Sequence, residues 1–137
     1  MSLTREVIQP KNPALNASKN LKLPHSPGIR AGDFIYLSGM VSIDPVTGLP
    51  SPGSVEHETR TILENMSHML ESAGSSLSRA VKVNVCLADI VLFDTMNGVY
   101  REFFPVNPPA RTTCGVQLSM GLKVEIEVIA LHGEETA

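Results

Sequence analysis

Apolar side chains between residues 54 and 74 recur every three or four positions, the spacing that places them on one face of an α-helix. The positions of this stripe are Val55, Thr59, Ile62, Leu63, Met66, Met69, Leu70 and Ala73. Ser54 suits the N-cap, and Gly74 suits the end of such a helix. Glu56 and Glu58 would lie in the first turn, where acidic side chains complement the helix dipole.

A second helix is predicted over residues 92–104, where large side chains keep a helical spacing and Pro105 prevents continuation. These side chains are Phe93, Met96, Tyr100 and Phe103. Asn97 in this helix is a mediocre helix former, and we predict a structural role for it.

Strands are predicted where apolar residues alternate with polar or small ones, over residues 81–88 and 124–131. Residues 34–41 are rich in β-branched and aromatic side chains and lead into a turn at residues 44–48. A further strand opens at Arg111. The order is a strand pair, a helix, a strand, a helix and two strands, which is typical of an α+β fold.

Two helices of this length can cover only one face of the sheet. On the other face, the last strand combines charged side chains with Ile129 and Leu131, a mixture too apolar to remain in water. Another subunit is the simplest cover, and symmetric closure would place sites at shared edges.

The chain length of 137 residues is typical of one domain, so we treat residues 1–137 as a single domain. Residues 1–27 form its N-terminal segment and proline-rich loop. The part from residue 9 to residue 27 contains four prolines and several asparagines, which break regular elements. We predict an ordered loop that adds little to the core.

Composition narrows the choice of partners and compartment. A net charge of −3 and an aromatic content of 4% argue against binding to nucleic acid. The N-terminus lacks the apolar core of a signal peptide and no stretch is long enough to span a membrane, so we expect a soluble, cytoplasmic protein. Cys86 and Cys114 show no metal-binding or disulfide pattern, and we expect reduced thiols.

Two residues in the last third of the chain are suited to an organic acid. Arg111 follows Pro109 at the mouth of a strand, and its planar guanidinium can hold a carboxylate through two hydrogen bonds. Glu125 lies in a strand otherwise built of Val, Ile and Ala, so its half-buried carboxylate could position or deprotonate a water. Together they predict a small site for an organic acid.

Several ordered motifs resemble the Rid (RidA/YjgF) reactive intermediate deaminases over roughly residues 28–131. They are Gly32-Asp33-Phe34-Ile35-Tyr36-Leu37-Ser38-Gly39, the Thr59 to Gly74 helix, Val81-Lys82-Val83-Asn84-Val85, Met96-Asn97-Gly98-Val99-Tyr100, Pro109-Ala110-Arg111 and Val124-Glu125-Ile126-Glu127-Val128-Ile129-Ala130. The resemblance implies a single mixed β-sheet with two main helices packed on one face, the chorismate-mutase-like architecture. It also implies a homotrimer with clefts between subunits.

The resemblance further implies hydrolysis of 2-imino or enamine acids to 2-keto acids and ammonia, with no metal or other cofactor required. Arg111 would bind the substrate carboxylate and Glu125 would orient a water. Gly39 and Ser38 would line the cleft, and Thr113 would contact the substrate through its backbone.

This chain departs from the family pattern in two places. The family cysteine two residues after the arginine is replaced by Thr113, and the following Cys114 should point to the opposite side of the strand. The family tyrosine is replaced by His25, which can change charge near neutral pH, after a loop with extra residues near Ala14 to Leu21. We therefore include His25 among the substrate-binding residues and expect a reshaped mouth.

Three alternatives remain open at this point. One is a ligand-binding or chaperone-like trimer that keeps the cleft without turnover. Another is an endoribonuclease, reported for some relatives of the family, against which the low basicity argues. The third is a deaminase for a narrower class of acids, such as aminomuconate-like substrates.

Overall fold

The computed structural model of the chain describes residues 4–133. Its strands and main helices are β1 (Arg5–Ile8), α1 (Ala17–Asn20), β2 (Gly28–Ala31), β3 (Phe34–Val41), α2 (Val55–Ser72), β4 (Ala80–Leu87), α3 (Phe93–Phe103), β5 (Ala110–Gly115) and β6 (Val124–Leu131). Short 3-10 turns cover Pro13–Leu15, Leu77–Arg79 and Ile90–Leu92.

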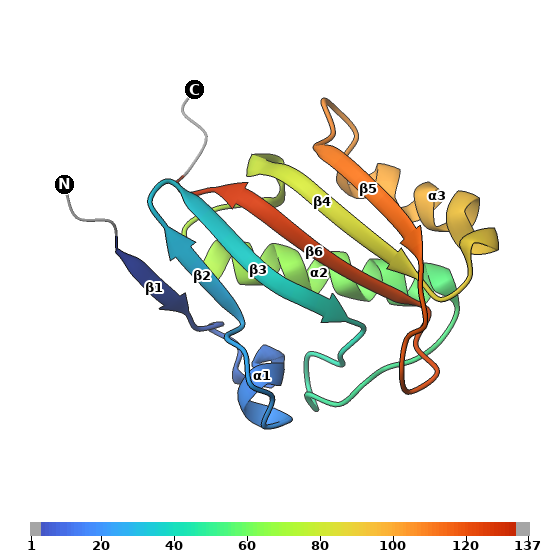
Figure 1. Cartoon of the computed structure of the whole chain (residues 1–137), viewed down its shortest axis with the longest axis horizontal. Helices are drawn as coiled ribbons and strands as arrows, with labels where there is room; N and C mark the ends of the chain where they lie inside the picture. The colour runs from blue at the N-terminus through green and yellow to red at the C-terminus, as the bar shows by residue number, and fades with distance from the viewer. Residues whose placement is uncertain (1–3, 134–137) are drawn as a thin grey trace.

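Within the described residues the strands form one six-stranded sheet in the order β1-β2-β3-β6-β4-β5 (Figure 1). Neighbouring strands are antiparallel except β4 and β5, which are parallel. The parallel pair arises because α3 carries the chain from the end of β4 back along the sheet before β5 begins. The sheet is therefore mixed.

Helices α2 and α3 lie on the same face of the sheet and pack against each other (Figure 1). The core fills the space between this face and α2, with Ile35, Ile62, Leu63, Met66, Leu70, Val83, Met96, Val124 and Ile126 fully buried. The predicted fold, a single mixed sheet with two main helices on one face, is confirmed.

The helical periodicity placed α2 correctly. Its N-cap is Ser54, whose hydroxyl accepts a hydrogen bond from the His57 N–H at 3.1 Å. Gly74 follows the helix with φ 78°, a left-handed conformation that glycine adopts without a steric penalty. His57 is exposed, as expected for a residue outside the buried stripe.

The N-terminal segment contains more regular structure than the sequence predicted. Asparagine side chains build it: Asn12 accepts a hydrogen bond from the Ala14 N–H, and Asn16 accepts one from the Lys19 N–H at the start of α1. Leu15 between them is buried and joins the core. These asparagines start short turns of helix, whereas the sequence analysis took them only as breakers of regular structure.

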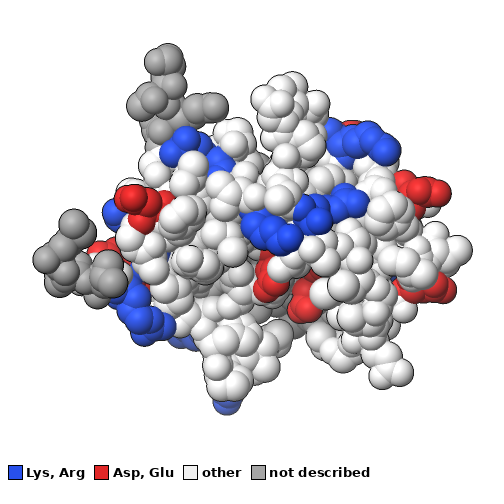
Figure 2. Space-filling model, turned by 45° about the horizontal axis from the view of Figure 1, so that its top comes forward, with Lys and Arg blue, Asp and Glu red and all other residues white. Residues whose placement is uncertain are grey.

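Among residues 4–133, no helix lies over the opposite face of the sheet (Figure 1). Polar pairs lie across it, including Lys82 Nζ with Thr112 Oγ1 at 3.0 Å and Asn84 Nδ2 with Glu127 Oε1 at 2.6 Å. In the view of Figure 2, acidic and basic side chains are scattered over a surface that is largely uncharged. No helix within residues 4–133 is both long enough and apolar enough to cross a membrane.

Candidate functional site

Arg111 lies on the helix-covered face of the sheet. It pairs in register with Val83, which is completely buried in the core, so the two side chains point to the same side. The guanidinium carbon lies 4.7 Å from the centre of the Tyr100 ring and 5.5 Å from that of Phe93. Two cation–π contacts from α3 therefore hold the guanidinium in place.

A hollow of about 250 Å³ surrounds Arg111 at the edge of the sheet. It is lined by Asn97, Tyr100, Arg101, Phe104, Pro108, Pro109 and Arg111. Asn97 Oδ1 and Tyr100 Oη are buried, and neither has a hydrogen-bond partner among the described residues. Asn97, for which a structural role was predicted, thus faces the same hollow as Arg111.

Tyr100 remains a hydrogen-bond donor beside Arg111. Burial raises the pKa of Tyr100 above its usual value, and the charge of the nearby guanidinium only partly opposes this shift. The phenol is consequently protonated at neutral pH. A protonated phenol and a guanidinium together favour an anionic group in this hollow.

Glu125 lies on the other face of the sheet. It is in register with Cys86, which pairs in turn with Cys114 on β5. The Glu125 side chain is half-buried, and Gly39 on β3 lies directly against it. A Cβ atom on Gly39 would come within 3.1 Å of Glu125 Cδ and 3.2 Å of its Oε1. Because glycine has no side chain, Gly39 leaves room for the Glu125 carboxylate and for a group bound to it.

Gly39 occupies this position because β3 is irregular there. The register between β3 and β6 shifts between Leu37 and Met40, a β-bulge that includes Ser38 and Gly39. Ser38 Oγ donates to the Ser26 carbonyl at 2.6 Å and its N–H donates to the Pro27 carbonyl at 3.0 Å. Ser38 thus ties the bulge to the preceding loop.

A cavity of about 210 Å³ opens beside Glu125. Its lining residues are Leu15, Ala17, Ser18, Leu21, Leu23, His25, Pro27, Ser38, Gly39, Met40, Val41, Ile43, Met69, Ser119, Met120 and Glu125. His25 is exposed at this cavity, and its Nδ1 lies 2.7 Å from Ser18 Oγ. The loop therefore places His25 at this cavity, and its role in substrate binding stays a prediction.

The structure divides the predicted site residues into two sets. Ser38, Gly39, His25 and Glu125 meet at the cavity described above, whereas Arg111 is on the opposite face of the sheet. Within a single chain Arg111 and Glu125 therefore do not meet, and a site shared between subunits stays a prediction. Alternation along a strand shows which of its own residues share a side. The pairing of β5 and β6 with β4 is needed to show that Arg111 and Glu125 point to different faces of the sheet.

The predicted orientations of Thr113 and Cys114 agree with the register. Thr113 pairs with the buried Val85 and shares the face of Arg111, and Cys114 points to the other side. Both cysteines are free thiols. Burial, followed by the negative charge of Glu125, raises the pKa of Cys86, which keeps this thiol protonated. Among residues 4–133 no group of three or more His, Cys, Asp or Glu side chains is arranged to hold a metal ion.

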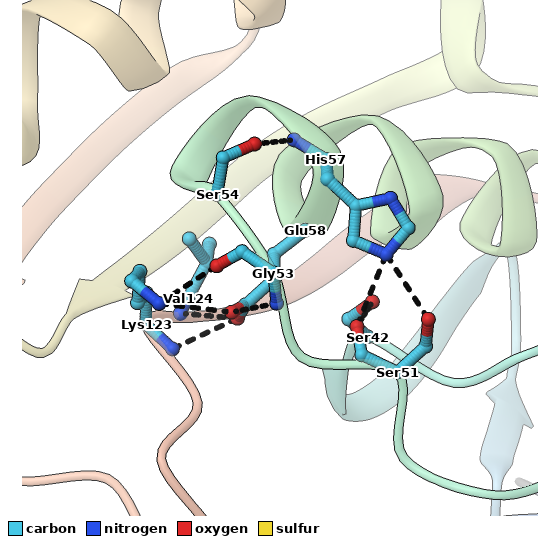
Figure 3. A network of polar contacts seen from close by, with 8 residues as sticks. All are labelled: Ser42, Ser51, Gly53, Ser54, His57, Glu58, Lys123 and Val124. Atoms are coloured by element: carbon cyan, nitrogen blue, oxygen red, sulfur yellow. Dashed lines mark hydrogen bonds and ion pairs between the residues drawn. The ribbon is translucent and has the colours of Figure 1, made fainter.

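A buried carboxylate missed by the sequence analysis supports the start of β6 (Figure 3). Glu58 on α2 is fully buried, and its Oε1 accepts hydrogen bonds from the N–H groups of Lys123 at 2.8 Å and Val124 at 3.3 Å. Its Oε2 accepts from the Gly53 N–H at 3.2 Å and lies 3.9 Å from Lys123 Nζ. Glu58 therefore anchors β6 one residue before Glu125.

The spacing of apolar residues along α2 indicates that Glu58 is buried. Glu58 stands three residues after Val55 and four before Ile62, so it belongs to the buried stripe. Its place in the first turn also suits the helix dipole, but this effect alone does not predict a buried carboxylate. An acidic side chain in such a stripe needs hydrogen-bond donors from another element, and the backbone of β6 provides them.

The fold and two half-sites, the hollow at Arg111 and the cavity at Glu125, define a class of protein. Comparison with known proteins identifies this class. Residues 17–132 match the family described as Endoribonuclease L-PSP, which is the YjgF or Rid family. The chain belongs to this family.

Individual relatives and structures agree with this assignment. A RutC family protein of Pyrococcus horikoshii is 43% identical over 108 residues, which are 78% of this chain and 86% of that protein. The human 2-iminobutanoate/2-iminopropanoate deaminase is 38% identical over 114 residues, covering 82% of this chain and 83% of the relative. The crystal structure of yeast Mmf1 superposes with a TM-score of 0.84 at 33% identity, covering 94% of this chain and 99% of that one.

Proposed function

We propose that this protein hydrolyses 2-imino acids and their enamine tautomers to 2-keto acids and ammonia, at sites that two chains build together in a homotrimer. Relatives at about 40% identity are named for this activity, including the human and bovine 2-iminobutanoate/2-iminopropanoate deaminases. The roles proposed for individual residues follow the family resemblance, and the geometry around Arg111 and Glu125 supports them.

The observation that carries the proposal is the separation of Arg111 and Glu125 onto opposite faces of one sheet. A small imino acid cannot contact both side chains through the sheet. Arg111 lies on the edge strand β5 and Glu125 faces the side without helices, so the Arg111 edge of one chain can approach the Glu125 face of another. Such a contact joins two different surfaces, and repetition around a closed ring gives every chain one complete site.

Arg111 binds the substrate carboxylate in this arrangement. Its guanidinium is already held over two aromatic rings, so little side-chain freedom is lost when the two hydrogen bonds to the carboxylate form. The protonated Tyr100 hydroxyl in the same hollow provides a further donor. These donors fix the orientation of the planar imino acid.

Glu125 activates the attacking water. The water donates a proton to the carboxylate while its oxygen bonds to the imine carbon, and the electron pair of the C=N bond moves to the protonated nitrogen. The resulting carbinolamine receives a proton on nitrogen, its C–N bond breaks and ammonia leaves, while loss of the hydroxyl proton forms the keto group. Imines already hydrolyse in water, so orientation and one base account for an acceleration.

Ammonia release from freshly generated imino acids tests this proposal. An amino-acid oxidase with catalase produces the 2-imino acid in the cuvette, and a coupled assay follows ammonia and keto acid. We expect the protein to accelerate release above the rate seen with the same amount of heat-denatured protein. Equal rates with folded and denatured protein would contradict the proposal.

A further inference from the structure

The cavity beside Glu125 has a composition that points to one part of the substrate. Buried core residues form its inner end, among them Leu15, Ile43 and Met69, which are at most 6% exposed. Leu21 and Leu23 line it nearer the surface. The carboxylate of Glu125 is its acidic group. The cavity thus joins one reactive polar group to a deep apolar interior.

Three of the other four polar side chains of the cavity already have partners, and the fourth, Ser119, is exposed at its outer end. Ser18 Oγ and His25 Nδ1 are 2.7 Å apart, and Ser38 Oγ donates to the Ser26 carbonyl. A ligand group in the interior therefore finds mainly CH₂, CH₃ and thioether surfaces. Such a lining favours an apolar group, because a polar one would lose its hydrogen bonds to water without replacement.

The outer wall is built by Ala17, Ser18, Leu21 and Leu23, which belong to α1 and the loop after it. The chain just before this wall is attached to α2, because the Lys11 N–H donates to Ser72 Oγ and the Asn12 N–H donates to His68 Nε2, both at 3.1 Å. In the wall itself, the Lys19 N–H donates to Asn16 Oδ1 at 3.1 Å and Asn20 Nδ2 donates to the Pro13 carbonyl at 3.0 Å. These hydrogen bonds hold the wall in place in the isolated chain.

We propose that this cavity holds the side chain of the substrate, and that the protein is selective for 2-imino acids with apolar side chains of about four to seven carbon atoms. This inference rests on the proposed deaminase function. The volume of about 210 Å³ is decisive here, since a dry apolar cavity of roughly 150 Å³ is enough for a benzene molecule. A methyl side chain would leave most of the space unused.

The expected selectivity follows from the transfer of methylene groups out of water. Each methylene buried in the transition state raises kcat/KM roughly fourfold. We expect kcat/KM to rise by about 10- to 60-fold from the imino acid of alanine to that of norleucine, and to remain high for those of leucine and phenylalanine.

A pair of variants links this trend to the cavity. Ala17 lines the cavity, so Ala17→Leu places three additional carbons in it, whereas Lys19→Leu adds a leucine to the exposed side of the same short helix. We expect Ala17→Leu to reduce the norleucine-to-alanine ratio of kcat/KM at least ~fourfold, the effect of one lost methylene site. Lys19→Leu should leave this ratio unchanged. Titration calorimetry measures the Kd values of 2-ketohexanoate and pyruvate, the keto acids of norleucine and alanine. Their ratio gives the corresponding selectivity in binding.

The possible results separate this inference from the function on which it rests. Turnover of all imino acids with no preference for long side chains would overturn the selectivity and leave the deaminase function standing. If the norleucine-to-alanine ratio of kcat/KM fell equally in Ala17→Leu and Lys19→Leu, the cavity would not be the origin of the selectivity. No turnover of any imino acid would overturn both. If Ala17→Leu does not fold, two wild-type measurements still test the selectivity. They are kcat/KM for the series of imino acids and the ratio of the affinities for 2-ketohexanoate and pyruvate.

Discussion

At the scale of single residues, Arg111 has a side chain whose position is restricted by two aromatic rings. The Tyr100 and Phe93 rings hold its guanidinium, and Tyr100 Oη and Asn97 Oδ1 are buried beside it without partners among the described residues. Buried polar groups usually have partners, so an incoming ligand or chain is a reasonable partner for these two. Arg111 is therefore the residue at which a conservative change should be most informative.

We expect Arg111→Lys to lower kcat/KM at least ~100-fold, equivalent to ~2.7 kcal/mol of transition-state binding. A lysine ammonium cannot donate two parallel hydrogen bonds or stack on both rings in the same way. The assay is ammonia release, with circular dichroism to verify the fold. Arg60→Lys, at an exposed ion pair with Glu102, is the matched control and should behave as wild type. Full activity of Arg111→Lys would remove Arg111 from the site.

Glu125→Gln should affect the chemical step more than binding. Glutamine keeps the shape next to Gly39 but cannot accept a proton from water at neutral pH. We expect kcat to fall ~100-fold while the Kd of a 2-keto acid product changes by less than ~3-fold. Glu127→Gln, two residues further on the same face, is the control, because its amide oxygen can still accept from Asn84. An equal loss of binding and turnover in Glu125→Gln would indicate a structural role.

At the scale of elements, local periodicity predicted α2, α3, β4 and β6, because one side of each is buried and the other is more exposed. The β-branched and aromatic composition of residues 34–41 predicted β3. The four-residue elements β1 and α1 are too short for a period to develop, and side-chain caps and pairing with β2 form them instead. The alternation of β6 already predicted that Glu125 faces the side without helices, whereas the face of Arg111 follows only from the pairing of β5 with β4.

The contact between α2 and β6 through Glu58 should be a main source of stability. We expect Glu58→Ala to lower the free energy of unfolding by about 3 to 5 kcal/mol, because three backbone N–H groups lose their acceptor. Glu58→Gln should cost less, since its amide oxygen can still accept from Lys123 and Val124. Urea unfolding at neutral pH measures both.

Glu56→Ala is the control for this comparison. Glu56 lies in the same first turn of α2 but is exposed, so its replacement should change stability by less than about 0.5 kcal/mol. A Glu58→Ala protein as stable as Glu56→Ala would show that the network in Figure 3 adds nothing to the fold.

At the scale of the whole molecule, the sheet face without helices and the two separated half-sites lead to the same expectation. The face carries Tyr36, Ile129 and the Asn84–Glu127 pair, and Tyr36 is 43% exposed in the isolated chain. Burial of such a face by other chains would remove apolar surface from water and complete the sites. We expect light scattering to give three times the chain mass of 14.8 kDa at micromolar concentration. A mass of one chain would contradict a shared site.

Mixing two inactive variants tests the shared site most directly. Arg111→Lys and Glu125→Gln chains are unfolded together in equal amounts, refolded and assayed for ammonia release. In a ring where each site takes Arg111 from one chain and Glu125 from the next, half of the chains supply each intact residue, so about a quarter of the sites regain both. We predict recovery of about a quarter of wild-type activity, with none when either variant is refolded alone. An inactive mixture of correctly refolded trimers would contradict the account.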